Sequence, residues 1–140
     1  MDNPGPFVFT LNQGAFSLSA AGAFVGDWIE DFAGVEALSL QASFTYGGGG
    51  GEATLFFQTS LDQGQTPIDI AAVALGDANS VSVVNLSALT PVTTPLTPAQ
   101  QSLAPGTSVN GVLGDRFRAV LVVASPFAAN TALAACGVAR

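Results

Sequence analysis

The chain has 140 residues, of which 49% are apolar and 9% are charged, and ten acids against three arginines give it a formal net charge of −7. This length is typical of one domain with a substantial core, and the apolar content excludes a disordered chain. The sequence has no lysine and no histidine, so it lacks the basic clusters that bind nucleic acids, and its negative charge excludes attraction to an anionic membrane.

The termini and the cysteine content indicate where the protein is made. No apolar run reaches the roughly 18 residues of a transmembrane helix, and Met1–Pro6 lacks the basic and apolar regions of a signal peptide. We therefore expect a protein that is made and used without Sec-dependent export. Cys136 is the single cysteine, which excludes an intrachain disulfide, and its Ala-rich surroundings are typical of a buried small hydrophobe.

The first thirty residues predict short strands and one acidic segment. A Pro/Gly-rich arm at 1–6 precedes a single domain at 7–140, with strands expected near 7–11 and 16–20. Trp28 is then surrounded by Asp27, Glu30 and Asp31. Either this segment is a solvated strand end with Trp28 in the core, or it is an interface that receives a cation or an arginine of a partner.

The middle of the chain carries the clearest strand pattern. Apolar and polar residues alternate over 38–46, 53–61 and 68–74, which is the period of a strand with one buried face. Five glycines at 47–51 separate the first run from the second. The simplest prediction from this order is three consecutive antiparallel strands.

A turn motif, Ser60-x-Asp62-x-Gly64-x-Thr66, joins the last two of these runs. We expect Asp62 to accept hydrogen bonds from backbone N–H groups two residues on, and Gly64 to adopt the positive φ that a tight hairpin requires. The spacing is similar to the Asp-box hairpin of sialidases, with Pro67 where that motif usually has an aromatic residue. We interpret it as a structural turn, because three arginines are too few for a sialidase site.

The second half of the chain combines strands with one long loop. Strands are predicted at 80–86, at 116–124 and, more weakly, at 131–140, and Arg116 and Arg118 lie in the strongest of them. Four prolines lie in 88–106, which predicts a mostly extended loop that lies against protein, with a short helical turn at 98–103. About eight strands with a late excursion favour an all-β sandwich, most consistent with a jelly roll.

Catalytic groups are scarce in this composition. Without histidine or lysine there is no imidazole base, Ser-His-Asp triad or Schiff-base lysine. Asp27 with Glu30 as a glycosidase pair, and a Ca²⁺ site near Asp62 or Asp77, are weaker interpretations than solvated surface acids. We expect a protein that is not an enzyme and has no cofactor.

Several stretches resemble small head proteins of tailed bacteriophages, the cement or decoration proteins of jelly-roll fold. They are Leu38–Ala42 through the glycine run, Gln58–Asp62 with Ile68–Ala71, Val84–Pro91 and Gly111–Arg118. The resemblance implies a virion protein that binds the outer surface of the capsid as a homodimer and clamps neighbouring subunits of the major capsid protein. It assigns no residue a role.

The residues themselves leave two function classes open. A charge-poor surface and strand edges without lysine suit a structural protein that is buried against a partner, with Arg116, Arg118, Asp27, Glu30 and Asp31 as candidate interface residues. The alternative is a carbohydrate-binding β-sandwich, associated with a phage tail or with a host glycan-binding system. Such a module would use exposed aromatic residues, and Trp28 and Tyr46 are the single Trp and Tyr of this chain.

Overall fold

The computed structural model describes residues 5–10 and 18–140, and within these residues it contains strands and no helix. The strands are β1 (Gly5–Val8), β2 (Gly22–Val25), β3 (Ala37–Thr45), β4 (Glu52–Ser60), β5 (Pro67–Leu75), β6 (Ser80–Ser87), β7 (Phe117–Ser125) and β8 (Ala132–Ala139). The prediction of an all-β chain is confirmed. The predicted strand at 16–20 lies partly outside the described residues, and 18–20 are not in a strand.

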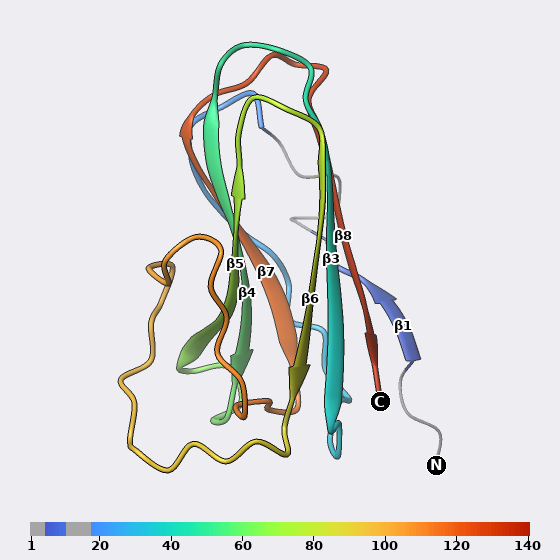
Figure 1. Ribbon diagram of the computed structural model, residues 1–140, viewed down its shortest axis with the longest axis vertical. Helices are drawn as coiled ribbons and strands as arrows, with labels where there is room; N and C mark the ends of the chain where they lie inside the picture. Colours follow the sequence, from blue (N-terminus) through green and yellow to red (C-terminus); the bar gives the residue numbers. More distant parts are fainter. Residues whose placement is uncertain (1–4, 11–17) are drawn as a thin grey trace.

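The strands form two four-stranded antiparallel sheets that pack face to face as a β-sandwich (Figure 1). The first sheet has the order β1-β8-β3-β6, and the second has the order β2-β7-β4-β5. Every connection between described strands crosses from one sheet to the other, except the hairpin β4–β5. The C-terminal strand β8, which looked weak in sequence, lies inside the first sheet between β1 and β3.

The prediction of three consecutive antiparallel strands is wrong, because β3 and β4 belong to different sheets. The glycine run spans the gap of about 10 Å between sheets instead of closing a hairpin. Ala128 N donates to Gly48 O at 2.9 Å, so the run is tied to the β7–β8 connection. Gly49 has φ +95°, and a Cβ there would lie 2.5 Å from Ala128 N, which explains why the crossing needs glycine.

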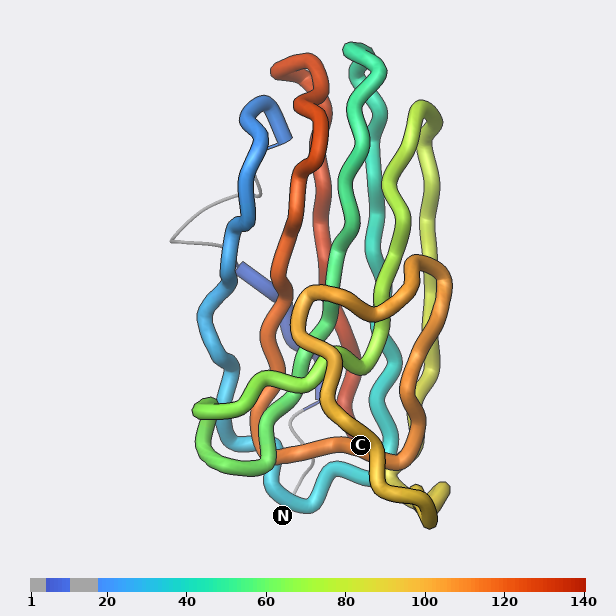
Figure 2. The backbone as a smooth tube through the Cα atoms, turned by 90° about the vertical axis from the view of Figure 1, so that its left-hand side faces the viewer, coloured from blue at the N-terminus to red at the C-terminus, as the bar shows by residue number. Residues whose placement is uncertain are grey.

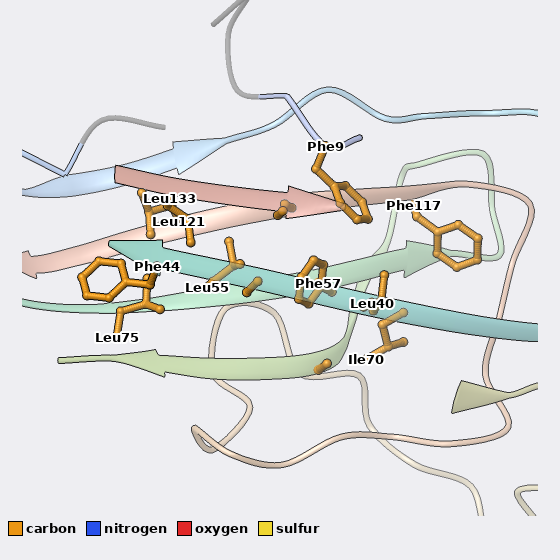
Figure 3. Packing of buried hydrophobic residues seen from close by; sticks show 14 of the residues in the cluster. Phe9, Leu40, Phe44, Leu55, Phe57, Ile70, Leu75, Phe117, Leu121 and Leu133 are labelled. Carbon is orange, nitrogen blue, oxygen red and sulfur yellow. The ribbon is translucent and has the colours of Figure 1, made fainter. Parts of the chain in front are cut away.

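The core lies between the two sheets and is rich in phenylalanine. Leu40 and Phe44 of β3 face Leu55 and Phe57 of β4, as Figure 3 shows, and all four side chains are buried. Phe117 of β7 contributes a further buried ring beside them. Each such side chain stabilises the fold by about 1.5–3 kcal/mol through the apolar area that it buries.

The connection between β6 and β7, residues 88–116, crosses the outside of the second sheet (Figure 2). Leu103 of this loop packs on a small cluster formed by Phe56, Ala72 and Val120, which point away from the main core. Val120 is consequently fully buried although it lies on the outer face of its sheet. The expectation that the uncharged stretch 88–106 lies against protein holds at Leu103, whereas residues 89–97 are exposed.

Part of the same loop also pairs with the edge of β5. Val109 N donates to Ile70 O at 2.8 Å, Ala72 N to Thr107 O at 3.1 Å, and Gly106 N to Ala72 O at 2.8 Å. The predicted helical turn at 98–103 is wrong, because the structure has bends there and no helix. The physical reason is that the backbone N–H groups of these residues bond to a buried carboxylate, which is described below.

Candidate interaction surface

Within the four described strands of the first sheet, no charged side chain points outward. We call the outer face of this sheet the uncharged face and define it by the outward side chains of its strands, whose exposed and half-buried positions alternate with buried ones. They are Pro6, Val8, Ala37, Ser39, Gln41, Ser43, Thr45, Val81, Val83, Asn85, Ser87, Ala132, Ala134, Cys136 and Val138.

One row of this face crosses all four strands. Val8 lies opposite Cys136, Cys136 opposite Gln41, and Gln41 opposite Val83. These four residues help to line a shallow depression of about 370 Å³. Val8 and Val83, at the two ends of this row, are 64% and 68% exposed.

The polar side chains of the uncharged face bond to one another. Gln41 Nε2 donates to Ser43 Oγ at 3.3 Å, and Asn85 Nδ2 donates to Ser39 Oγ at 2.7 Å. Covering this face would therefore leave fewer polar groups unsatisfied, which lowers the desolvation cost of binding. Cys136 lies half-buried on the same face, so the prediction that it is buried is wrong: it points outward, while Ala135 and Gly137 point into the core.

The charges lie elsewhere on the molecule. The charged residues within the described strands are Glu52, Asp69 and Arg118, and all three belong to the second sheet. Three charged residues, Glu36, Asp77 and Arg140, are exposed beside the strands of the first sheet without belonging to them. Arg140 follows β8, and its backbone N donates to Ala37 O at 3.0 Å, so its charge lies at one end of the uncharged face. The two outer faces of the sandwich therefore differ: the 88–116 loop partly covers the second sheet, whereas no described segment covers the uncharged face.

The acidic segment and the arginines, which the sequence suggested for a partner, bind each other. Arg116 Nη1 lies 2.8 Å from Glu30 Oε1, and Arg116 Nε lies 3.0 Å from Asp115 Oδ1. The hydrogen bond and charge of Asp115 raise the pKa of Arg116, and Arg116 in turn lowers the pKa of Asp115. Asp27 and Asp31 are exposed and form no ion pair with a described residue.

Arg118 joins the acidic segment to the centre of the second sheet. Its guanidinium lies over the Trp28 ring, with Cζ 4.4 Å from the ring centroid, and its Nε donates to Gln58 Oε1 at 2.8 Å. Burial lowers the pKa of Arg118. Trp28 thus packs outside the main core, and the arginine that the acidic segment receives comes from the same chain.

The turn at Ser60 is closed by its own side chains. Ser60 Oγ donates to Asp62 Oδ1 at 2.8 Å, Gly64 N donates to Ser60 Oγ at 2.9 Å, and Thr66 N donates to Asp62 Oδ1 at 2.7 Å. Asp62 therefore accepts a hydrogen bond from the residue four positions on, and the prediction of a bond from the residue two positions on is wrong. These hydrogen bonds, that to Thr66 first, lower the pKa of Asp62. Gly64 lies against Trp28 Nε1, so a ring from another segment stands beside this turn.

Asp69 is a buried carboxylate that sequence reasoning missed. It is 1% exposed, and its Oδ1 accepts Gln58 Nε2 at 2.8 Å and Gln101 N at 3.0 Å. Its Oδ2 accepts Ser102 N at 2.9 Å and Leu103 N at 3.1 Å. A charged residue within the apolar run 67–75 was the available signal, because a buried charge must find partners. Asp69 fastens the long loop to the second sheet.

Comparison with models of known protein families, with curated proteins and with solved structures finds no match to this chain. Within the described residues, no three Asp, Glu or Cys side chains lie close enough to share a metal ion. Nor does this part of the chain contain a helix that is long and apolar enough to cross a membrane. The uncharged face is therefore the feature on which a functional argument rests.

Proposed function

We propose that this chain is a structural virion protein, a cement protein that binds the outer surface of a tailed-phage capsid and clamps subunits of the major capsid protein. The observation that carries the proposal is the uncharged face. An acidic protein whose described residues leave the outer face of one sheet uncovered, with no charged side chain in its strands, has a surface suited to lasting contact with a partner. Interface cores are depleted in charged residues in the same way.

The fold supports the same proposal. The sheet orders β1-β8-β3-β6 and β2-β7-β4-β5, with crossings between sheets at nearly every connection, support the assignment of this β-sandwich as an eight-stranded jelly roll. This is the fold that the resemblance to cement proteins implies. The inference to capsid binding itself rests on that resemblance and on the face, and it concerns a surface and not a catalytic site.

The contacts of the aromatic residues favour this proposal over carbohydrate binding. Trp28 is occupied by the guanidinium of Arg118, and Tyr46 packs edge-on against Phe127 while its hydroxyl accepts Gly50 N at 3.2 Å. A sugar-binding platform needs an aromatic face that is free to stack on the ligand. A glycan array probed with the purified protein tests this alternative, and we expect no binding.

The proposal is tested by mixing the purified protein with undecorated phage heads and imaging them. The Cys136 thiol supplies a second measurement, because it lies on the uncharged face and is half-buried. We expect decorated heads, and we expect a maleimide to label Cys136 more slowly when the protein is bound. Heads that stay bare, or labelling at an unchanged rate on decorated heads, would refute docking through this face.

Two matched variants locate the interface. Gln41→Glu with Asn85→Asp adds two carboxylates to the uncharged face, whereas Gln63→Glu with Gln65→Glu adds two to the exposed turn of the β4–β5 hairpin. Both pairs change net charge equally and keep side-chain shape. Burying unpaired carboxylates is costly, so the first pair should weaken binding about tenfold or more and the second should have little effect.

A further inference from the structure

Strand β6 leaves half of its backbone groups without a partner. Ser87 N donates to Asn110 Oδ1 at 2.6 Å and Ser87 O accepts Gly111 N at 2.8 Å, so the backbone groups of Ser87 point away from β3. The backbone groups that bond to β3 are therefore those of the even-numbered residues of β6. In an antiparallel strand the direction of these groups alternates from residue to residue. The N–H and C=O groups of Val81, Val83 and Asn85 therefore also point away from β3, where the described residues offer them no partner.

This edge lacks the features that normally prevent strand pairing. The strand Ser80–Ser87 contains no charge and no proline, and Val81 and Val83 are 67% and 68% exposed. Natural sheet edges are usually protected by lysine, proline, bulges or a covering segment. The edge of β5 has such a cover, since the loop residues 106–109 bond to it. The contrast marks the β6 edge as an interaction site.

We propose that β6 pairs antiparallel with β6 of a second copy of this chain, around a two-fold axis at Val83. Val83 then faces Val83 of the second copy, and Val81 faces Asn85. The pairing forms about six backbone hydrogen bonds and joins the two first sheets into one. Asn110 and Gly111 already bond to the backbone groups of Ser87. The free N–H and C=O groups are therefore those of Val81, Val83 and Asn85, and the register centred on Val83 uses all of them.

Charge and area both favour a second copy as the occupant. Two chains of net charge −7 repel each other, and the β6 edge is a place where they can meet without bringing acids together. The uncharged face of one copy measures roughly 19 Å by 30 Å, or about 550 Å², from strand spacing and rise. A standard interface buries about 800 Å² per partner. Two faces joined side by side present more than that area to a partner. This advantage of a dimer rests on the proposed function, whereas the pairing at β6 rests on the free backbone groups of its edge.

Disulfide trapping tests the register. Val83→Cys and Val81→Cys are each made in a Cys136→Ala background, and both positions are equally exposed on the same face of the same strand. In the proposed dimer the two residues at position 83 face each other at about 5.5 Å between Cα atoms, which suits a disulfide, whereas the two at position 81 lie about 14 Å apart. Under mild oxidation we expect the Val83→Cys protein to cross-link at least tenfold faster.

A second measurement uses sedimentation of the purified protein without heads. The wild type should sediment as a dimer. Val83→Pro should be monomeric, because proline removes the outward N–H at the axis without breaking a bond to β3. Gln41→Lys, one strand further in, should stay dimeric. Equal cross-linking of the two cysteine variants, a monomeric wild type, or dissociation by Gln41→Lys but not by Val83→Pro would each overturn the proposal.

Discussion

A single buried carboxylate, that of Asp69, holds the long loop against the second sheet. It accepts four N–H groups, one from Gln58 and three from the loop backbone at Gln101, Ser102 and Leu103. Gln101 adopts a φ of +56°, which is uncommon for a side-chain-bearing residue and turns the backbone toward the carboxylate. Hydrogen bonds to a charged acceptor are stronger than neutral ones, so one residue orders a segment that has no regular structure.

Asp69→Asn should destabilise the protein by about 2–3 kcal/mol, because an amide NH₂ would replace one acceptor and face an N–H donor. The free energy of unfolding in urea measures this change. Asp77→Asn is the matched control, since Asp77 is exposed in a turn, and it should change stability very little. Equal midpoints for the two variants would show that the carboxylate does not hold the loop.

Asp62→Ala should lower stability slightly and in a pH-dependent way. The pKa of Asp62 lies below its ordinary value of 3.8 because its carboxylate accepts hydrogen bonds in the folded turn. The contribution of the Asp62 carboxylate to stability is therefore fully present above the ordinary pKa, and it is lost as the pH falls through the lower pKa of the folded state. The midpoint of thermal unfolding should be higher for the wild type than for Asp62→Ala above about pH 5, and the two midpoints should converge in stronger acid. A constant difference at all pH values would contradict this.

At the scale of elements, the loop 88–116 gives the second sheet a third layer. Leu103 and the outward side chains of Phe56, Ala72 and Val120 form an apolar cluster separate from the main core. This explains why Phe56 breaks the alternation of β4 and why Val120 is fully buried on an outer face. The described residues provide no equivalent cover for the first sheet, so the two sheets differ in how much of their outer face is exposed.

Leu103→Ala should destabilise the protein by about 1–2 kcal/mol and make the loop easier to cleave, because it removes apolar area from that cluster. Limited proteolysis together with urea unfolding measures both effects. Leu96→Ala in the same loop is the control, since Leu96 is 40% exposed and belongs to neither apolar cluster. If both variants were cleaved at the same rate, the loop would not depend on this contact.

At the scale of the whole molecule, charge is unevenly distributed. The acids and arginines gather at the strand ends and on the second sheet, whereas the first sheet presents an uncharged face and an unprotected edge at β6. The two arginines that sequence reasoning offered to a partner are engaged within the chain, Arg116 by Glu30 and Arg118 by Trp28. Binding to an external partner should therefore involve neither.

Binding to heads should depend little on salt, because the uncharged face offers no ion pair to screen. Replacing Arg116 and Arg118 by glutamine should lower thermal stability and leave the occupancy of heads unchanged. Counting bound copies at low and high salt, with the wild type and the double variant, checks both statements. A strong salt effect, or lost occupancy at unchanged stability, would move the interface to the charged side of the molecule.

The local pattern of the sequence determined the strand content and the inward residues of the strongest strands. Leu38, Leu40 and Phe44 point inward as their alternation predicts, because the side-chain period of two is a property of the strand itself. The charge-poor surface was likewise readable from composition. The turn residues from Ser60 to Thr66 could be named from sequence because their hydrogen bonds span at most four positions.

The tertiary structure alone decided what depends on segments far apart in the chain. β3 does not pair with β4, because β6 and β8 occupy both edges of β3, and β5 and β7 occupy both edges of β4. Cys136 became a surface residue, and Asp69 a buried one, according to which segments cover each sheet. Such contacts join residues that lie tens of positions apart, and the strand period of two carries no information about them.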